Sequence, residues 1–198
     1  MDATQPATAT PWPYAILEWH PEDSAPPVVQ EVLARVRANT QRLRQIIASQ
    51  GWPGRDLVGE DGADAAWLIL QHAGGGVTTL DTTENRQFRR DCVPLLEAAV
   101  CAGQAHPRHL AHLVDGIQAV EGADPVYGVL GDQYTVVDGH PVFARSVDHA
   151  ALDARRSAIG LAPLSTDVAR RERGEDIPAI GPDQVEPWPT PGRPGHVR

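Results

Sequence analysis

The stretch PPVVQEVLARVRANTQRLRQIIASQG, residues 26–51, decides the fold class of this chain. Its apolar residues recur at the three- and four-residue spacing of one helix face, and arginines occupy much of the remaining surface. Gly51 follows the last turn and closes the run. The pattern therefore predicts a long amphipathic helix over residues 26–50.

A second helix is predicted to begin at Asp61, which is a good N-cap, and to end at the glycines of residues 74–76. Its run of apolar residues around Trp67 leaves no polar face, which is typical of a helix buried all round. Glu60, Asp61 and Asp64 form an acidic group that suits a catalytic cluster. Their position before a helix favours capping instead.

Two more helices are predicted in the middle of the chain. Thr82 or Thr83 is the expected N-cap of the first, and Pro94 predicts a kink or a break within it. His106-Pro107 begins the next, because proline is tolerated in the first turn of a helix.

The period then changes from helical to alternating. Residues 133–146 predict a β-hairpin with a tight turn at Asp138-Gly139, and Pro141 confines the second strand to an edge. Asp148 and Ser165 are the expected starts of two short helices.

The expected fold is mainly α: a compact bundle of five or six helices with one β-hairpin packed at the side. It occupies residues 26–173. Residues 1–25 are interpreted as an arm rich in proline and aromatic residues. Residues 174–198, with five prolines after Gly181, are expected to be a disordered tail.

Composition limits the function classes. The chain has 17 basic and 26 acidic residues and a formal charge of −9, which disfavours nucleic-acid binding. All of the basic residues are arginines, so Schiff-base chemistry on a lysine is excluded. No apolar stretch reaches the length of a membrane span, and the N-terminal region does not resemble a signal peptide. A cytoplasmic location without membrane contact is therefore expected.

The two cysteines, Cys92 and Cys101, lie nine residues apart in one predicted helix. That spacing separates them by about 13 Å along the helix axis, too far for a disulfide. We expect two buried thiols that pack as small hydrophobic groups.

Gln71 and His72 are polar residues in an apolar helix, and the helical wheel places both inside the protein. Each must then find hydrogen bonds, because a buried polar group without partners costs about 1–3 kcal/mol. One interpretation is a satisfied core network, and the other is an acid–base histidine oriented by a neighbour.

His109, His112 and Asp115 follow one another at three-residue spacing on the helix after Pro107. Two histidines and a carboxylate suit a divalent transition metal. A solvated helix face explains the same spacing without a metal and is favoured here.

Four segments together resemble a bacterial family catalogued as domain of unknown function 6624. They are GWPGRDLVGEDGADAAWLILQHA, QFRRDCVPLLEAAVCAGQAHPRHLAHLVD, VYG and LDARRSAIGLAPL. The resemblance covers about residues 28–170, and its order and spacing are more specific than any single motif.

Against the family pattern this chain keeps Gln71, His72, Phe88, Asp115 and the pair Tyr127-Gly128. It departs at five polar positions. Gly74 replaces an aspartate, Arg89 a glutamine and Gly116 an arginine, and Val129 and Leu130 replace a threonine and a second glutamine. The kept residues imply a shared pocket in the family, and the departures imply that its chemistry has changed here.

These observations predict a cofactor-independent acid–base enzyme of a bacterial, specialised pathway that acts on a small molecule or peptide-like substrate. His72 and Asp115 are the expected catalytic residues. The expected substrate-binding residues are Gln71, Tyr127, Trp67 and Arg89. The alternative is a non-catalytic module that binds a ligand, a second copy of the chain or a pathway protein, and a metal enzyme using His109 and His112 is the weakest interpretation.

Overall fold

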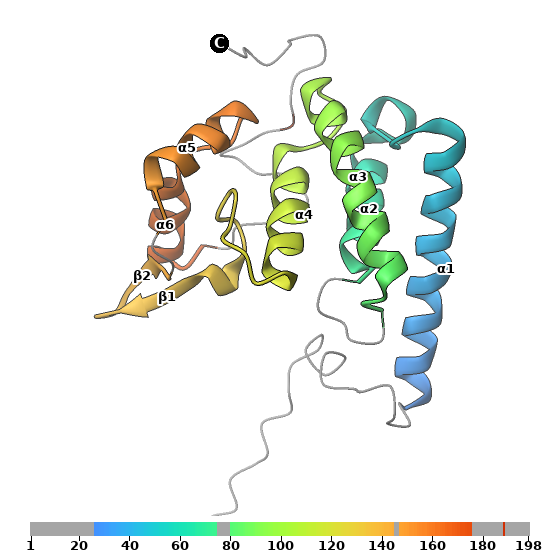
Figure 1. The fold of residues 1–198 in the computed structure, drawn as a ribbon, viewed down its shortest axis with the longest axis horizontal. Coiled ribbons are helices and arrows are strands. Elements are labelled where there is room, and N and C mark those ends of the chain that lie inside the picture. The colour runs from blue at the N-terminus through green and yellow to red at the C-terminus, as the bar shows by residue number, and fades with distance from the viewer. Residues whose placement is uncertain (1–25, 75–79, 145–146, 176–187, 189–198) are drawn as a thin grey trace, which may run out of the picture.

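The computed structural model describes residues 26–74, 80–144, 147–175 and 188, which form six α-helices and one two-stranded hairpin (Figure 1). The helices are α1 Pro27–Gln50, α2 Arg55–His72, α3 Thr83–Cys101, α4 Pro107–Val120, α5 His149–Ala158 and α6 Leu164–Glu172. A 3-10 turn at Gly131–Gln133 precedes the strands β1 Tyr134–Val137 and β2 His140–Phe143. The mainly α fold class is confirmed, whereas the arm at 1–25 and most of the tail lie outside the described residues.

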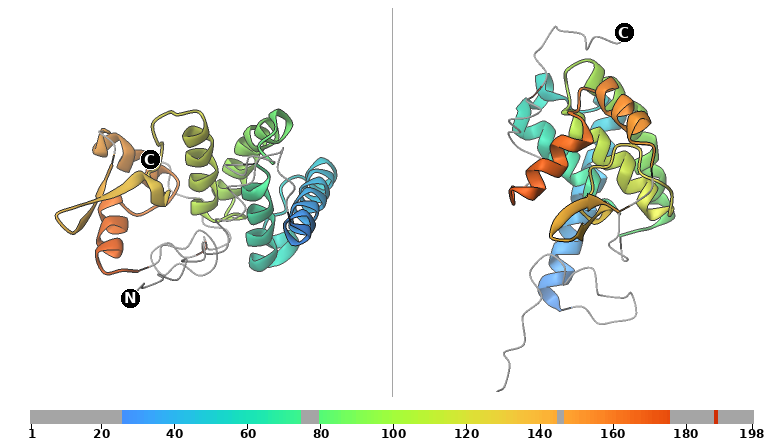
Figure 2. Two further views of the ribbon diagram at one scale, coloured as in Figure 1. Left: turned by 90° about the horizontal axis from the view of Figure 1, so that it is seen from below. Right: turned by 90° about the vertical axis from the view of Figure 1, so that its left-hand side faces the viewer.

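Helix α4 stands in the middle of the molecule. Helices α1, α2 and α3 lie on one side of it, and the hairpin with α5 and α6 lies on the other (Figures 1 and 2). The main core forms among the first four helices, around Trp67, Leu70, Leu96 and Leu113. A smaller core on the other side of α4 contains Tyr127. Residues of α4 thus contribute to both cores.

Helix α2 differs from its prediction at the start and on its surface. It begins at Arg55 rather than after Asp61, because Gly59 adopts a positive φ of 74° and joins an extra first turn to the main helix through a kink. Leu68 is 37% exposed, so the helix is not buried all round. The other faces of α2 meet neighbouring helices, but this part of its surface meets solvent.

The starts of α3 and α4 are confirmed. The Thr82 hydroxyl accepts a hydrogen bond from the Asn85 N–H, and the His106 imidazole accepts one from the Arg108 N–H at 3.1 Å. The break predicted at Pro94 is wrong, because α3 continues through it to Cys101. Its buried side chains pack along α4, and this packing outweighs the single backbone hydrogen bond that proline removes.

The hairpin is confirmed with its predicted turn. Asp138 and Gly139 have φ values of 51° and 84°, as the mirror-image turn of a two-residue hairpin requires. Pro141 pairs with Val136 in a sheet of two strands, where the missing N–H leaves no inner ladder incomplete. Strand β2 packs against α6.

A buried ionic network joins the two sides of the molecule. The Asp167 carboxylate of α6 accepts hydrogen bonds of 2.8 Å from Arg108 of α4 and Arg156 of α5, and all three side chains are at most 1% exposed. Arg156 also donates to the carbonyl oxygen of Tyr127 at 2.8 Å. The network fixes α5 and α6 against α4.

The thiols are both free, but only one matches its prediction. Cys92 is buried, and burial raises the pKa of its thiol to about 12. Cys101 is exposed at the end of α3, so its predicted burial is wrong. No helix among the described residues combines the length and hydrophobicity needed to cross a bilayer.

Candidate functional site

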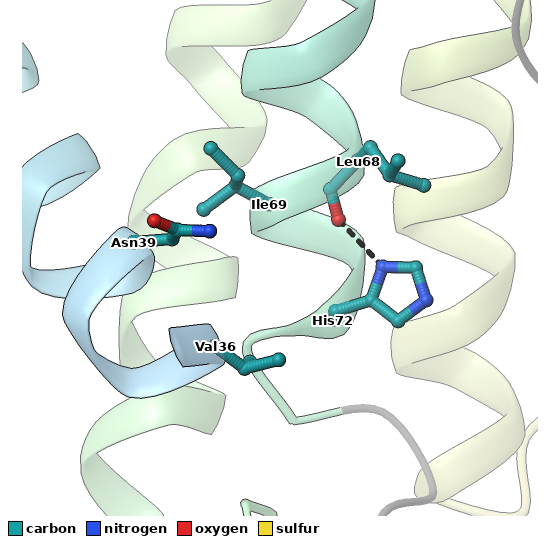
Figure 3. Close-up of a pocket in the computed structure, with 5 residues that line it drawn as sticks. All are labelled: Val36, Asn39, Leu68, Ile69 and His72. Carbon is teal, nitrogen blue, oxygen red and sulfur yellow. Dashed lines mark hydrogen bonds between the residues drawn. The ribbon is translucent and has the colours of Figure 1, made fainter. Parts of the chain in front are cut away.

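His72 lies at the surface, contrary to the predicted burial. Its Nδ1 is 2.8 Å from the carbonyl oxygen of Leu68 in its own helix, and this contact occupies that nitrogen (Figure 3). The side chain lines a pocket of about 140 Å³ with Leu68 and Ile69 of α2 and Val36 and Asn39 of α1. This volume is below the roughly 300 Å³ of ordinary ligand pockets.

Asp115 is fully buried and holds a loop. Its carboxylate accepts hydrogen bonds from the backbone N–H groups of Val126, Tyr127 and Val129 at 2.8, 2.9 and 3.0 Å. The phenol of Tyr127 is part of the small core, where burial raises its pKa. Asp115 and Tyr127, both predicted site residues, therefore stabilise the loop after α4 and its small core. They do not form a site with His72.

A histidine–carboxylate pair lies between α2 and α4. The Nε2 atom of His109 is 3.1 Å from Oδ1 of Asp64, and the His109 side chain is 1% exposed. The imidazole stacks on the Trp67 indole, with ring centroids 4.8 Å apart and planes 11° from parallel. The indole N–H donates to the carbonyl oxygen of His109 at 2.9 Å. Trp67 therefore fixes both the ring and the backbone of His109.

Two more histidines extend this group. His112 meets the edge of Trp67 at 5.9 Å, and His106 lies 5.6 Å from His109 between ring centroids. Burial lowers the pKa of His109, partly opposed by Asp64, and lowers that of His112 to about 3. Both rings are therefore neutral at pH 7, and the solvated face predicted for them is wrong.

Several polar atoms of this region lack hydrogen-bond partners among the described residues. They include both ring nitrogens of His109, of which Nε2 lies 3.1 Å from Asp64 without hydrogen-bond geometry, and also Nε2 of His112 and Oε1 of Gln71. Asp64, Trp67 and Gln71 share one face of α2 by their three- and four-residue spacing. We define the Asp64–His109 site as Asp64, Trp67, Gln71, His106, His109 and His112.

Trp188, the described residue farthest along the chain, covers part of the Asp64–His109 site. Its ring meets the rings of His106 and His109 edge-on, with centroids 5.8 Å apart in both cases. The Arg55 guanidinium carbon lies 5.7 Å from the centre of the same indole. An aromatic side chain therefore already occupies the approach to His109.

Asp64, His106 and Trp188 are members of this site that the sequence pattern did not indicate. Asp64 was interpreted as a capping residue, although its spacing to Trp67 and Gln71 was visible. The three-residue spacing of the histidines at positions 106, 109 and 112 was also visible. Their burial was not, because no pattern indicated that Trp188 packs against them.

Arg89 lies elsewhere, near two of the glycines that depart from the family pattern. It is 2% exposed, and a Cβ atom built on Gly116 would lie 2.8 Å from its Nη2. A Cβ on Gly74 would lie 3.8 Å from its Cδ. Three of the five departures noted in the sequence therefore meet in space.

The metal interpretation gains no support from the described part of the chain. It holds no group of three or more His, Cys, Asp or Glu side chains placed to bind one metal ion. Asp115, the predicted third ligand beside His109 and His112, is occupied by the three N–H groups of its loop.

The fold and site define a small helical domain that encloses a histidine–carboxylate pair. The chain belongs to the family described as "Family of unknown function (DUF6624)", whose match extends over residues 19–174 and confirms the resemblance. No curated protein and no solved structure matches the chain significantly.

Proposed function

We propose that this chain is an acid–base enzyme that acts on a small molecule or a peptide-like substrate. His109 transfers the proton, and Asp64 orients the imidazole and balances its charge. The observation that carries the proposal is a buried imidazole with a carboxylate 3.1 Å from one nitrogen and, among the described residues, no hydrogen-bond partner at the other. Such an imidazole has one nitrogen available for substrate.

The proton positions follow from this geometry. A neutral His109 that carries its proton on Nε2, beside the Asp64 carboxylate, has its lone pair on Nδ1. Nδ1 then accepts a proton from substrate, and the resulting imidazolium is stabilised by the Asp64 carboxylate at 3.1 Å. Burial keeps the pKa of His109 low, so the ring begins the reaction as a base.

The neighbours supply rigidity and polarity. Stacking on Trp67 restricts rotation of the imidazole, which reduces the reorganisation needed for proton transfer. Gln71, a predicted substrate-binding residue, has a side-chain oxygen that no described residue engages, and this oxygen can accept a hydrogen bond from substrate. This proposal gives His109 the role first expected of His72, because no carboxylate of the described residues is paired with the His72 imidazole.

The test is a comparison of variants in a turnover screen. Pools of amides, esters, small acids and short peptides are incubated with the protein and followed by mass spectrometry. We expect His109→Gln to lower turnover by roughly 10²–10⁴-fold, with a smaller loss for Asp64→Asn. His72→Gln is the matched control and should retain activity. A folded His109→Gln protein with full turnover would falsify the proposal.

A second measurement needs no substrate. Nitrogen-15 NMR of the histidine rings reports which nitrogen carries the proton. We expect the Nε2-protonated tautomer for His109. A ring protonated at Nδ1 would leave no base at the open position and would contradict the assigned role.

A second candidate is a non-catalytic module that binds an aromatic side chain of a peptide. It is favoured by the Trp188 indole, which packs edge-on against the rings of His106 and His109. Trp188→Ala separates the candidates. An enzyme should gain turnover because its site is uncovered, whereas a module should gain affinity for a tryptophan-containing peptide without turnover.

The proposal includes the bacterial cytoplasm as the location and specialised metabolism as the setting. Two free thiols suit a reducing compartment, and the acidic surface suits neither membrane nor nucleic-acid partners. Fractionation of the native host with an antibody against the chain tests the location.

A further inference from the structure

Strand β1 is an open edge of the hairpin. The sheet of the described residues has two strands, so each strand has one side without a strand partner. Strand β2 packs against α6, and the hairpin projects from the rest of the molecule (Figures 1 and 2). An unpaired strand edge carries a row of backbone N–H and C=O groups that a further strand can bind.

The register decides which backbone groups of β1 face outward. The two residues that flank a two-residue turn form a hydrogen-bonded pair, so the N–H and C=O of Val137 point toward β2. The same alternation is seen beyond the strands, where the Ala144 N–H donates to the Gln133 carbonyl oxygen at 2.8 Å. Val136 pairs with Pro141 in the alternate, non-hydrogen-bonded position. The N–H and C=O of Val136 therefore point away from β2.

The two edges of the hairpin differ in how well they are protected. On β2 the outward-facing position is Pro141, whose missing N–H disfavours a further strand. Strand β1, with the sequence Tyr-Thr-Val-Val, contains no proline and no charged residue. Val136 is 69% exposed, and Val137 and Val142 of the same hairpin are also exposed. The edge of β1 is therefore apolar and open to another strand.

We propose that β1 pairs antiparallel with β1 of a second copy of this chain, with the two-fold axis at Val136. Each Val136 N–H then donates to the carbonyl oxygen of Val136 in the other copy, and the two side chains lie opposite each other. In this register Asp138 lies opposite Tyr134 of the second copy, so no two carboxylates meet. An uncharged, apolar strand is better matched by its own antiparallel copy than by a charged strand.

The pairing is expected to be weak, because β1 has four residues. Stable interfaces bury about 1,200–2,000 Å² in total, and one short strand from each copy provides less. We therefore expect a dissociation constant on the order of 0.1 mM, as for a transient interface. The inference rests on the hairpin alone, so it stands whether or not the chain is an enzyme.

The experiment is analytical ultracentrifugation of the full chain at concentrations about tenfold below and about tenfold above this dissociation constant. We expect mainly monomer at the low concentration and mainly dimer at the high one. Val136→Lys places two like charges opposite each other on the axis, so it should weaken the dimer by about tenfold or more. Val28→Lys makes the same change at a 60% exposed residue of α1 and is the matched control, which should leave the dimer unchanged.

Two further results separate this pairing from a general effect on folding. Val136→Lys and Val136→Glu mixed in equal amounts should restore the dimer, because opposite charges then meet on the axis, whereas each variant alone should stay monomeric. In the parent protein, hydrogen exchange of the Val136 amide should slow as the concentration rises. The Val137 amide is bonded within the hairpin, so its exchange should not change.

The proposal is overturned by a parent protein that stays monomeric at the high concentration, which would leave the edge to a strand of another protein. A dimer that persists in folded Val136→Lys would also overturn it. So would a dimer in which the Val136 amide exchanges as fast as in the monomer, since the contact would then lie elsewhere. A mixture of the two charged variants that stays monomeric would refute the axis at Val136.

Discussion

Replacing Asp115 with asparagine removes the acceptor that organises the loop after α4. In the native protein one carboxylate oxygen accepts from Val126 and Tyr127, and the other accepts from Val129. The asparagine oxygen can retain the first two bonds, but its NH₂ group then faces the Val129 N–H. The alternative rotamer leaves two N–H groups without an acceptor, so it is worse.

The cost follows from these contacts. Two hydrogen bonds lose the assistance of a charge, at about 0.5–1 kcal/mol each, and one buried N–H is left unsatisfied at about 1–3 kcal/mol. The free energy of unfolding should therefore fall by about 2–5 kcal/mol. Urea unfolding followed by circular dichroism measures it, with Asp132→Asn as the exposed control, which should change it by less than about 0.5 kcal/mol. A loss below about 1 kcal/mol in Asp115→Asn would refute the structural role given to this carboxylate.

Three other predictions concern different parts of the molecule. Asp167→Asn should lower the free energy of unfolding by about 3–5 kcal/mol in urea titrations, because it leaves two buried arginines short of a charge partner, whereas Glu31→Gln in an exposed pair should cost less than about 1 kcal/mol. A thiol reagent at neutral pH should modify one thiol of the native protein and none in Cys101→Ser, because Cys92 is buried with a pKa of about 12; two fast-reacting thiols would contradict this. The pKa of His112 is about 3 in the folded protein and about 6.5 in the unfolded chain. The unfolded state therefore binds more protons below pH 6.5, and the free energy of unfolding decreases as the pH is lowered through that range. Unfolding at pH 7 and pH 5 should show a loss of about 2 kcal/mol from this group that His112→Gln no longer shows.

Local patterns were sufficient for most of the fold. Periodicity predicted the long helix α1 to within a residue, and the pair Asp138-Gly139 predicted the hairpin turn, because both depend on the nearest residues in the chain. The failures at α2 and Pro94 have a different origin. A kink at Gly59 and a helix that continues through proline depend on what packs around them, which a local pattern does not contain.

The candidate site was less accessible to sequence reasoning. Asp64 and His109 are 45 residues apart in the sequence and meet because Trp67 fills the space between α2 and α4. The local sequence explained Asp64 as a helix cap and His109 as a solvated residue. Neither explanation indicated that the two residues form a pair. Gln71 was singled out for its polar character in an apolar helix, and Arg89 for its departure from the family pattern. Both carry polar atoms that have no hydrogen-bond partner among the described residues.

The contact between Arg89 and Gly116 also constrains how this protein can evolve. Glycine within a helix costs roughly 0.5–1 kcal/mol relative to alanine, so selection for stability alone would replace Gly116. While Arg89 is present, any larger residue at that position collides with Nη2 of the guanidinium. Substitutions at the two positions must therefore occur in a fixed order. Arg89 must be replaced or must change its side-chain conformation before Gly116 can be replaced by a residue with a higher helix propensity.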